Sequence, residues 1–452
     1  MAKPGSTFAD RALDHDPIRA SDQAIGRLRA LHPTLIDLST GRVERLLEAL
    51  DRPQDRLGRV IHVAGTNGKG STVAYLRAIA EAAGLKVHAL TSPHLVRFAE
   101  RIRIAGRLIT DEALDQRINE VEAANAGAPI SFFEISTVLA FHAFAAEPAG
   151  VTLVEVGLGG RFDATNVFAR PAASVITPVD LDHLEWLGPE LGNIAWEKAG
   201  ILKAGAPGII ARQKEEALAV IEAEAERVGA PLRIMGRDFD AWEERGRLML
   251  QLEDRLYDLP PPALAGPHQV ANAGLAAAAI LAIGEPRIDD DALARGLETA
   301  VWPGRFQRLT AGPLAGAART RGADLWLDGA HNPHAARALA EAAARLTARD
   351  GRPLTLIVGM LGRKDARGFF EAFAGLRPRL FVTGFHSESA TPPEILAEAA
   401  CAAGLDAQLA EGVEAALSAA LAVEGPAPHV IICGSLHFIG DVLALSPDTW
   451  PR

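Results

Sequence analysis

The 452-residue chain is poor in cysteine, in aromatic residues and in basic charge. Its two cysteines, Cys401 and Cys433, are too few for a disulfide framework and lack the paired spacing of a zinc site, so we expect a reducing, cytoplasmic setting. Asp and Glu outnumber Lys and Arg, and the net charge of −11 excludes a broad electrostatic affinity for nucleic acid or anionic lipid. Any anion must therefore be bound in a local site.

Long apolar runs are missing as well. The N-terminal segment lacks the apolar core of a signal peptide, and the Ala-rich stretch 271–283 is too short to cross a bilayer. We expect no nucleic-acid partner, no membrane association and a monomer. The length suggests two or three domains, and the content of 48% apolar and 23% charged residues is typical of a globular protein.

Apolar runs alternate with helical patterns along the first two thirds of the chain. The predicted strands are residues 60–64, 87–91, 151–156, 174–178 and 208–211, with helices such as 71–83 and 133–146 between them. This alternation predicts a mostly parallel sheet with helices on both faces, because strands covered on both sides read as continuous apolar runs. Residues 236–259 are charged and alternating, which predicts a small antiparallel excursion before helices near 269–284 and 289–301.

A second alternation begins after the sequence Trp-Pro-Gly-Arg at 302–305, where proline and glycine end the preceding helix. The predicted strands of this part are residues 324–328, 354–358, 380–383 and 429–433. We therefore predict an α/β protein with a P-loop-type domain of mostly parallel sheet over residues 1–301. A linker over 302–310 and a smaller Rossmann-like domain over 311–452 complete the predicted organisation.

The strongest local signal is the segment VIHVAGTNGKGST, in which an apolar strand leads through glycines and a lysine into a helix. Glycines let the backbone approach phosphate, N–H groups at the helix start point at the anion, and Lys69 can reach the outer phosphates. The loop departs from the common pattern G-x-x-x-x-G-K-[ST], because Gly65 is close to Gly68 and Gly70 separates Lys69 from Ser71. The alternative interpretation is a glycine-rich turn with a solvated lysine.

The variant loop GTNGKGS resembles that of the Mur ligase superfamily, and in particular that of the folylpolyglutamate synthase and dihydrofolate synthase family. Further segments resemble the same family in the expected order, and they extend over most of the chain. These segments are TSPHL at 91–95, ERIR at 100–103, VEVGLGGRFDATN at 154–166, DHLEWLG at 182–188, EKAGI at 197–201, Asn272, WPGR at 302–305 and DGAHNP at 328–333. The resemblance implies an ATP-dependent acid–amine ligase that works through an acyl phosphate.

Polar residues that follow the predicted strands are candidates for a metal site. Glu155 lies near the end of an apolar strand, where a carboxylate is costly unless it is paired or binds a metal, and ligands bind at this edge of an open α/β sheet. By resemblance, Ser92 and Glu155 bind a first Mg²⁺ and His183 binds a second. The alternatives are a turn position before Pro93 for Ser92 and a salt bridge or helix cap for Glu155. For His183 the alternative is a structural histidine, and for Asp182 it is local turn bonding.

Lys198, in the segment EKAGI, resembles a lysine that carbon dioxide carbamylates in the family. Carbamylation would turn a cation into a carboxylate able to bind magnesium. Extra metal charge offsets the mutual repulsion of ATP phosphates, a substrate carboxylate and an acyl phosphate. The alternative is an exposed helix lysine. The resemblance makes Lys69, Lys198 and His183 the predicted catalytic residues.

The resemblance also implies contacts with ATP and glutamate from both domains. The predicted ATP-binding residues are Gly65, Thr66, Asn67, Gly68, Lys69, Gly70, Ser71, Asn272, Arg305 and Asp328. Arg305 is expected to reach phosphate from the linker, and Asp328 is expected to face the ribose or base. The alternatives are a surface arginine for Arg305, a helix cap for Asp328 and a helix amide for Asn272. His331 and Ser435 follow strands of the second domain and are expected to help hold glutamate.

The segment LHPTLIDL at 31–38 resembles folate-type members of the family. The predicted pterin- or folate-binding residues are Ile36, Asp37, Leu38, Ser131, Phe132, Phe133, Glu134, Phe162, Asp163 and Ala164. Aromatic faces suit a flat pterin, and carboxylates suit its ring N–H groups. One of the two neighbouring phenylalanines, Phe132 and Phe133, is expected to pack in the core instead.

The predicted reaction joins L-glutamate to dihydropteroate, tetrahydrofolate or another reduced folate, with ATP and two Mg²⁺ ions. The N-terminal pterin segment favours a bifunctional enzyme over a dihydrofolate synthase with a single activity. One rival is a cell-wall ligase that uses a nucleotide-linked muramyl acid, which the short N-terminus argues against. Another is an ATP-gated binding protein without turnover, which the retained Glu155, His183 and Lys198 argue against.

Overall fold

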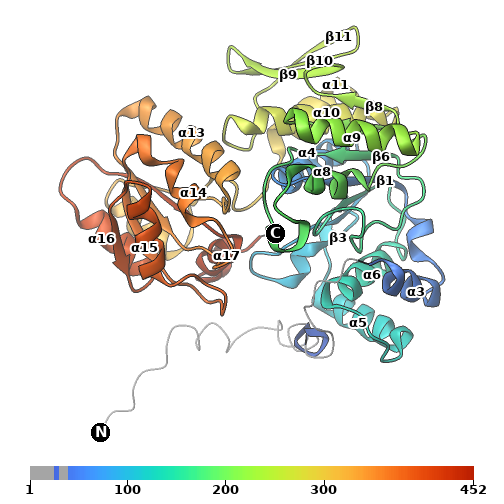
Figure 1. Cartoon of the computed structure of the whole chain (residues 1–452), viewed down its shortest axis with the longest axis horizontal. Coiled ribbons are helices and arrows are strands. Elements are labelled where there is room, and N and C mark those ends of the chain that lie inside the picture. The colour runs from blue at the N-terminus through green and yellow to red at the C-terminus, as the bar shows by residue number, and fades with distance from the viewer. Residues whose placement is uncertain (1–24, 30–38, 452) are drawn as a thin grey trace.

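The computed structural model describes residues 25–29 and 39–451. Ile36, Asp37 and Leu38, predicted to line a pterin site, therefore lie outside the described residues. Figure 1 shows two α/β lobes side by side, the smaller of them formed by the orange and red end of the chain. Each lobe contains its own sheet, so the predicted fold class of two α/β units, the first dominated by parallel strands, is confirmed.

The first lobe is built on an eight-stranded sheet in the order β4-β3-β2-β5-β1-β6-β7-β8. Its strands are β1 (Arg59–Ala64), β2 (Val87–Leu90), β3 (Ile102–Ile104), β4 (Arg107–Leu108), β5 (Val151–Glu155), β6 (Ala173–Ile176), β7 (Gly208–Ile210) and β8 (Leu232–Ile234). The six strands from β2 to β8 in this order run parallel, and β3 and β4 add an antiparallel edge. All five predicted strands are present, whereas β3, β4 and β8 were not predicted.

Helices cover both faces of this sheet, as its buried strands require. One face carries α4 (Lys69–Ala82), α10 (His268–Ala282) and α11 (Asp290–Thr299). The other face carries α3 (Gly41–Ala49), α5 (Asp111–Asn125), α6 (Phe132–Phe144), α8 (Leu191–Ala199) and α9 (Glu215–Val228). Successive residues of β1 serve both cores, because Ile61 and Val63 pack with the first group and Val60 with the second.

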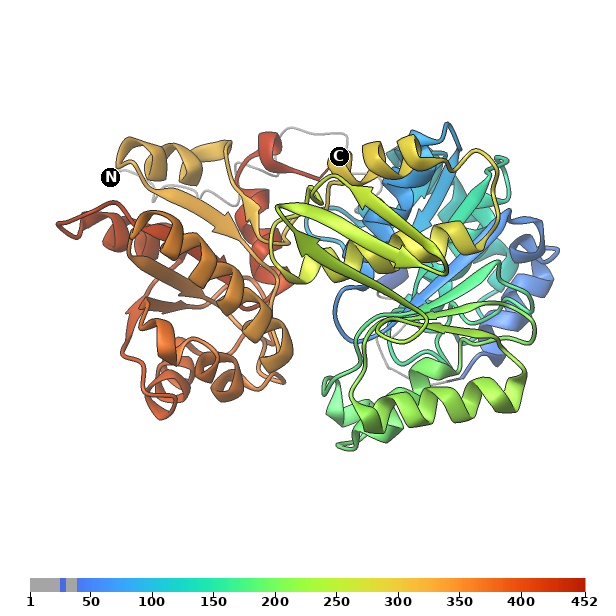
Figure 2. The same ribbon diagram turned by 90° about the horizontal axis from the view of Figure 1, so that it is seen from above.

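A separate three-stranded antiparallel sheet follows the large sheet, as the sequence predicted. It consists of β9 (Phe239–Glu244), β10 (Arg247–Leu252) and β11 (Arg255–Leu259). Seen from above in Figure 2, these strands lie across α10, and the methyl group of Ala241 packs closely against Gly274 of that helix. The excursion therefore covers a helix of the first lobe, and Glu243 of β9 also forms an ion pair with Arg345 of α13 in the second lobe at 3.2 Å.

The second lobe has a six-stranded sheet in the order β12-β13-β17-β14-β15-β16, parallel except for β12. Its strands are β12 (Gln307–Arg308), β13 (Asp324–Leu327), β14 (Leu354–Val358), β15 (Arg379–Thr383), β16 (Ala407–Ala410) and β17 (His429–Cys433). Its helices are α12 (Gly312–Thr320), α13 (Pro333–Asp350), α14 (Ala366–Glu371), α15 (Pro393–Ala402), α16 (Val413–Ala422) and α17 (Leu436–Ala444). Leu356 faces a core with α13 to α15 and Ile357 a core with α12, α16 and α17, so this sheet is also covered on both faces.

Short helical turns complete the described chain. They are η1 (Pro53–Arg56), η2 (Phe98–Arg101), α7 (Leu184–Leu187), η3 (Ala374–Leu376) and η4 (Pro447–Thr449). Among the helices within residues 25–29 and 39–451, none combines the length and apolarity that a membrane-spanning helix needs.

Candidate active site

A cleft of about 300 Å³ lies between the phosphate loop and the second lobe. Its volume is at the lower end of the roughly 300–1,000 Å³ that small-molecule sites occupy. The predicted residues that line it are Gly65, Thr66, Asn67, Gly68, Lys69, Gly70, Ser71, Ser92, Glu155, His183, Lys198, Asn272, Arg305, Asp328 and His331. Several of them follow β1, β2 and β5, so the cleft lies at the carboxyl edge of the large sheet, where open α/β sheets bind ligands.

The phosphate loop connects β1 to α4 by a path that requires glycine. Gly68 has φ +92°, and a Cβ atom added there would lie 2.6 Å from Oδ1 of Asn272. The Lys69 ammonium donates to the carbonyl oxygens of Gly65 (3.1 Å) and Thr66 (3.3 Å), so it is held over the loop. Burial lowers the pKa of Lys69, and an anion bound in the loop would restore the charged form.

Two of the predicted metal ligands have the environment that such a role requires. The Glu155 carboxyl ends β5 with only 5% of its surface exposed, and the backbone N–H of Ser92 donates to its Oε2 at 3.2 Å. Burial raises the pKa of Glu155, which a bound cation would reverse. Burial, followed by the charge of Lys364, lowers the pKa of His183 to about 4, so its imidazole is neutral at pH 7, as a metal ligand must be.

The donor set suits a cation that completes its coordination from other molecules. Within residues 25–29 and 39–451, no three His, Cys, Asp or Glu side chains converge into a metal cage. Mg²⁺ is commonly held by one or two carboxylates together with substrate phosphates and water. Ser92, Glu155 and His183 offer a hydroxyl, a carboxylate and an imidazole around a cleft that is wide enough for such partners, so these residues fit a divalent cation.

Lys198 lies in the last turn of α8 and faces the same cleft. Its side chain is buried, with 5% exposed, so the alternative of a solvent-exposed lysine is wrong. In the part of the chain that the structure describes, its amine has no hydrogen bond or ion pair. Burial, followed by the charge of Lys69, lowers the pKa of Lys198 to about 7. A buried amine that is partly neutral near pH 7 is chemically suited to react with carbon dioxide.

The second lobe contributes Arg305 and Asp328 to the cleft. The Asp328 carboxylate accepts the backbone N–H of Phe306 at 2.7 Å and that of Ala330 at 2.8 Å, so it joins the linker to the end of β13. Burial raises the pKa of Asp328 and lowers that of Arg305. The predicted alternative of a surface arginine is wrong for Arg305, since its guanidinium is desolvated beside Asp328 and Glu155.

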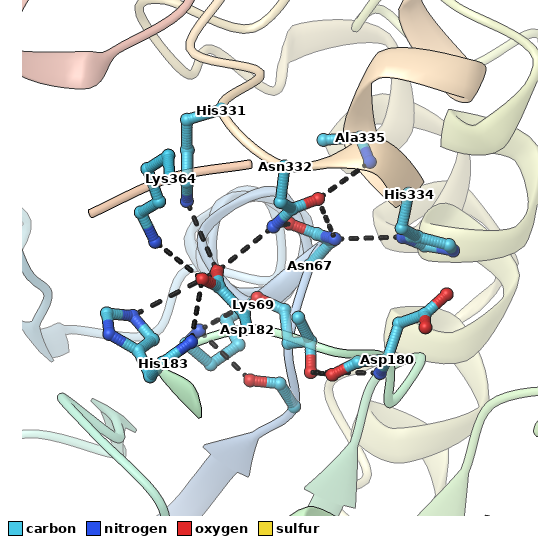
Figure 3. Close-up of polar contacts among 12 residues, drawn as sticks. Asn67, Lys69, Asp180, Asp182, His183, His331, Asn332, His334, Ala335 and Lys364 are labelled. Atoms are coloured by element: carbon cyan, nitrogen blue, oxygen red, sulfur yellow. Dashed lines mark hydrogen bonds and ion pairs between the residues drawn. The ribbon is translucent and has the colours of Figure 1, made fainter. Parts of the chain in front are cut away.

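Asp182 joins the two lobes at this cleft (Figure 3). Its carboxylate accepts Nζ of Lys364 at 2.5 Å and Nδ2 of Asn332 at 3.0 Å, and Nε2 of His331 lies 3.4 Å away. Burial opposes ionisation of Asp182, but His331 and Lys364 outweigh it and hold its pKa well below the ordinary value. The alternative given from the sequence, local turn bonding, is also present, because Oδ1 of Asp182 accepts the N–H of His183 at 2.9 Å. Sequence reasoning missed Lys364, which lies in a loop of the second lobe without a motif of its own.

A second bridge runs from the phosphate loop itself. Asn67 and Asn332 exchange side-chain hydrogen bonds at 3.1 and 3.2 Å, and Asn67 also contacts Nδ1 of His334 at 2.8 Å. Asn332 in addition caps α13 by accepting from the N–H of Ala335. Asn332 and His334 were missed as site residues, although Asn332 lies in the segment 328–333 that sequence reasoning had singled out and His334 follows it directly.

Known proteins resemble this chain over nearly its whole length. Residues 304–436 match the model of the Mur ligase, glutamate ligase domain. The dihydrofolate synthase/folylpolyglutamate synthase of Bacillus subtilis (strain 168) is 33% identical over 418 residues, which cover 89% of this chain and 93% of that protein. The structure of E. coli FolC in complex with DHPP and ADP superposes with a TM-score of 0.82 at 31% identity and covers 93% of this chain and 96% of that one.

A further solved structure is that of a bifunctional folylpolyglutamate synthase/dihydrofolate synthase with Mn, AMPPNP and L-glutamate bound. It superposes with a TM-score of 0.81 at 31% identity and covers 93% of this chain and 97% of that one.

The chain belongs to the dihydrofolate synthase/folylpolyglutamate synthase family. This membership confirms the resemblance found in the sequence, and it makes the protein a member of a family of ATP-dependent Mur-type ligases.

Against this family background, part of the predicted pterin set has a structural role. Ser131 caps α6 by accepting the N–H of Glu134, and the Glu134 carboxylate returns to the N–H of Ser131 at 2.7 Å. The same carboxylate forms a two-pronged ion pair with Arg42 at 2.8 and 3.0 Å. Phe132 is buried in the core against Phe98, as expected for one of the two phenylalanines.

The rest of the predicted pterin set lies next to the cleft. The Phe133 ring packs against Gly157, and the Asp163 carboxylate accepts the N–H of Leu158; Gly157 and Leu158 both line the cleft. Ala164 is buried, and Phe162 is 40% exposed with its ring near Trp196. Of the two predicted glutamate contacts, His331 lines the cleft, whereas Ser435 is buried at the start of α17 and accepts the N–H of His437.

Proposed function

We propose that this protein joins L-glutamate to dihydropteroate and to reduced folates, using ATP and an acyl-phosphate intermediate. The observation that carries the proposal is the convergence of the phosphate loop, Glu155, His183 and Lys198 with second-lobe residues on one cleft. The relatives bearing both activities in their names support a bifunctional enzyme over one that makes only dihydrofolate.

In the first step, a carboxylate oxygen of the acid attacks the γ-phosphorus of ATP, the bond to the bridging oxygen breaks, and ADP leaves. The loop N–H groups after Gly65 and the Lys69 ammonium hold the phosphates and offset the charge that develops on them. Divalent cations held by Ser92, Glu155 and His183 would supply further positive charge. Arg305 reaches the same phosphates from the linker, and Asn272 supports the loop from α10.

In the second step, the amine of glutamate attacks the acyl carbon. Phosphate leaves with the electron pair of the broken bond, and the amine proton passes to solvent or to phosphate. We assign the glutamate carboxylates to His331 and the neighbouring second-lobe residues, with Ser435 positioning the start of α17. Contacts of Asp182 with Lys364 and Asn332 hold the lobes together, which excludes the water that would hydrolyse the acyl phosphate.

Carbamylation of Lys198 is part of the proposal. Its amine is buried, has no side-chain partner among residues 25–29 and 39–451, and lies beside the charge of Lys69. A carbamate would replace a buried cation by an anion that both Lys69 and a divalent cation favour.

Ser131 and Glu134 act in this scheme by shaping the first turn of α6. The residues closer to the pterin are Phe133, Phe162, Asp163 and Ala164. We further propose that the enzyme acts as a monomer in the cytoplasm.

The proposal is tested by incubating the purified protein with ATP, MgCl₂ and L-glutamate and with either dihydropteroate or tetrahydrofolate. We expect phosphate release that requires both glutamate and the acid, and a product heavier by one glutamyl residue in mass spectrometry. His183→Ala should abolish both signals. If neither acid supports glutamate-dependent release, the proposal fails. Tight ATP binding without turnover would then favour an ATP-gated binding protein, and turnover of a nucleotide-linked muramyl acid would favour a cell-wall ligase.

A further inference from the structure

A second cavity of about 330 Å³ opens onto the reaction cleft from behind the linker. The two cavities share five lining residues: Ser92, Pro93, Glu155, Arg305 and Leu436. The back wall comes from α4 and β3, and the front comes from the linker and from residues 448–451, which return to the junction of the lobes (Figure 1). A ligand in this second cavity would therefore reach the atoms that react in the first.

Most of the charged side chains that line this cavity have a partner or belong to the reaction cleft. Arg305 and Glu155 belong to the reaction cleft, and Arg308 forms an ion pair with Asp324. The Glu100 carboxylate is occupied, because it accepts three backbone N–H groups of residues 95–97. Asp448 is exposed on the outer rim.

The remaining cations are Arg77 and Arg103. Arg103 donates to the carbonyl oxygen of Gly106 at 2.9 Å, and burial, followed by the like charge of Arg77, lowers its pKa to about 10. Arg77 has no hydrogen bond or ion pair among the residues that the structure describes, and its Nε–H is buried without an acceptor. Burial lowers the pKa of Arg77, and the nearby Glu81 offsets this only in part. A half-buried guanidinium without a partner is costly unless a ligand supplies the missing acceptor.

A second donor without an acceptor among residues 25–29 and 39–451 belongs to another lining residue, Trp450. The indole Nε1–H of Trp450 is buried and has no acceptor within the described part of the chain, while Arg97 lies over its ring at 5.4 Å. Leu108, Trp302 and Leu309 add aliphatic and aromatic surface to the lining. This combination of N–H donors and apolar surface suits a chain that carries carboxylates at intervals of a few methylene groups.

We propose that this second cavity binds a carboxylate of a glutamyl unit, with Arg77 as its principal contact. The inference rests on the proposed function, since that function brings glutamyl groups to Ser92 and Glu155. Two sources share this chemistry. One is the γ-linked glutamyl tail of a folate whose terminal carboxylate is being activated, and the other is the incoming glutamate. The tail is the better fit, because incoming glutamate is expected on the His331 side of the cleft.

The test compares Arg77→Gln with wild type, using dihydropteroate, a monoglutamyl and a triglutamyl tetrahydrofolate as acids. Loss of a charge-assisted contact predicts a rise of about tenfold or more in KM for the triglutamate. KM for dihydropteroate, which lacks a glutamyl unit, should not change. A rise in KM for L-glutamate with every acid would instead assign the cavity to the incoming amino acid. Unchanged KM values for all substrates would overturn the proposal.

Three further variants control for folding and for charge. Arg77→Lys retains a cation and should recover much of the affinity, and Trp450→Phe retains the ring but should raise the same KM severalfold. Arg107→Gln makes the same charge change at an exposed residue of β4 outside the cavity and should behave as wild type.

A binding experiment decides the inference independently of turnover. Tri-γ-glutamate is titrated into wild type and Arg77→Gln by calorimetry, with AMPPNP and Mg²⁺ present. We expect binding by wild type that weakens about tenfold in the variant. Equal affinities, or no binding by wild type, would overturn the inference even if the ligase activity is established. Weakened binding without any turnover would retain the cavity and reject the proposed function.

Discussion

Burial, together with the charge of Lys69, changes the chemistry available to Lys198. A lysine amine reacts with carbon dioxide only in its neutral form, and the ordinary value of 10.5 leaves almost none of it at pH 7. With the pKa lowered to about 7, roughly half of the amine is neutral at that pH. Conditions below pH 7 favour the ammonium form of Lys198 and oppose its carbamylation, whereas alkaline conditions favour the reactive amine.

We therefore expect Lys198→Ala to lower kcat by about a hundredfold or more, with partial rescue by acetate or propionate. In wild type, added bicarbonate should stimulate turnover in carbon dioxide-depleted buffer more strongly at pH 6 than at pH 8. The measurement is phosphate release across this pH range. Lys203→Ala, at a half-buried lysine whose Nζ donates to Gly200, is the matched control and should show no rescue. Full activity of Lys198→Ala would contradict the assignment.

The residues that sequence reasoning found and missed differ in where their partners come from. The phosphate loop and Glu155 follow strands and carry their signal in neighbouring residues. The partners of Asp182 and the cavity that Arg77 lines come from other elements, so these surroundings exist only once the lobes have docked or the helix has packed. Glu134 differs from both, because the family resemblance predicted a pterin contact for it. Its observed contacts are the cap of α6 and the ion pair with Arg42, and these depend on the fold.

At the scale of elements, variants in the first turn of α6 allow an effect on stability to be distinguished from an effect on substrate binding. Ser131→Ala should cost about 1 kcal/mol through loss of the cap. Glu134→Ala should cost about 2 kcal/mol, because it removes the two-pronged ion pair with Arg42 and the hydrogen bond from the N–H of Ser131. Urea denaturation measures both changes. Thr110→Ala, which removes the comparable cap of α5, is the control for a pure capping effect.

The KM for dihydropteroate distinguishes the two roles of this turn. If Ser131 and Glu134 act only through the helix, KM should stay within about twofold of wild type in folded protein, as with Thr110→Ala. A tenfold rise for Glu134→Ala at temperatures where the variant is fully folded would instead restore the direct pterin contact that the sequence predicted.

Strands buried on both faces were predictable and edge strands were not. The predicted strands, such as β1 and β14, are almost entirely buried, and so they appear as apolar runs. The unpredicted β4, β8, β12 and β16 are the four outer strands of the two sheets, and β3 is the neighbour of one of them. These strands are short and partly exposed, so their residues carry no period that differs from that of a loop.

At the scale of the whole molecule, the lobes meet through two kinds of contact. Around Asp182 and Asn67 the contacts are polar and can exchange with water or substrate as the cleft changes. On the other side, α17 packs directly on the segment after β2, and a Cβ atom added at Gly440 would lie 2.1 Å from the carbonyl oxygen of Leu95. Because backbone faces backbone there, this contact sets how closely the lobes approach.

Gly440→Ala should therefore separate the lobes without changing any polar residue of the cleft. The added methyl group forces a shift that costs about 1–3 kcal/mol and displaces Leu436 and His331 relative to the phosphate loop. We expect kcat/KM to fall about tenfold or more, because small displacements of reacting groups are costly. The radius of gyration with AMPPNP and Mg²⁺ bound, measured by X-ray scattering, should exceed that of wild type.

Gly316→Ala is the matched control, since Gly316 lies in α12 of the same lobe with no atom within 4 Å of an added Cβ. It should stabilise the protein by up to about 1 kcal/mol and leave turnover unchanged. Gly440→Ala with wild-type kcat/KM and an unchanged radius of gyration would show that α17 yields to the methyl group locally. In that case the polar contacts around Asp182 and Asn67, which both variants retain, would be what holds the lobes at their distance.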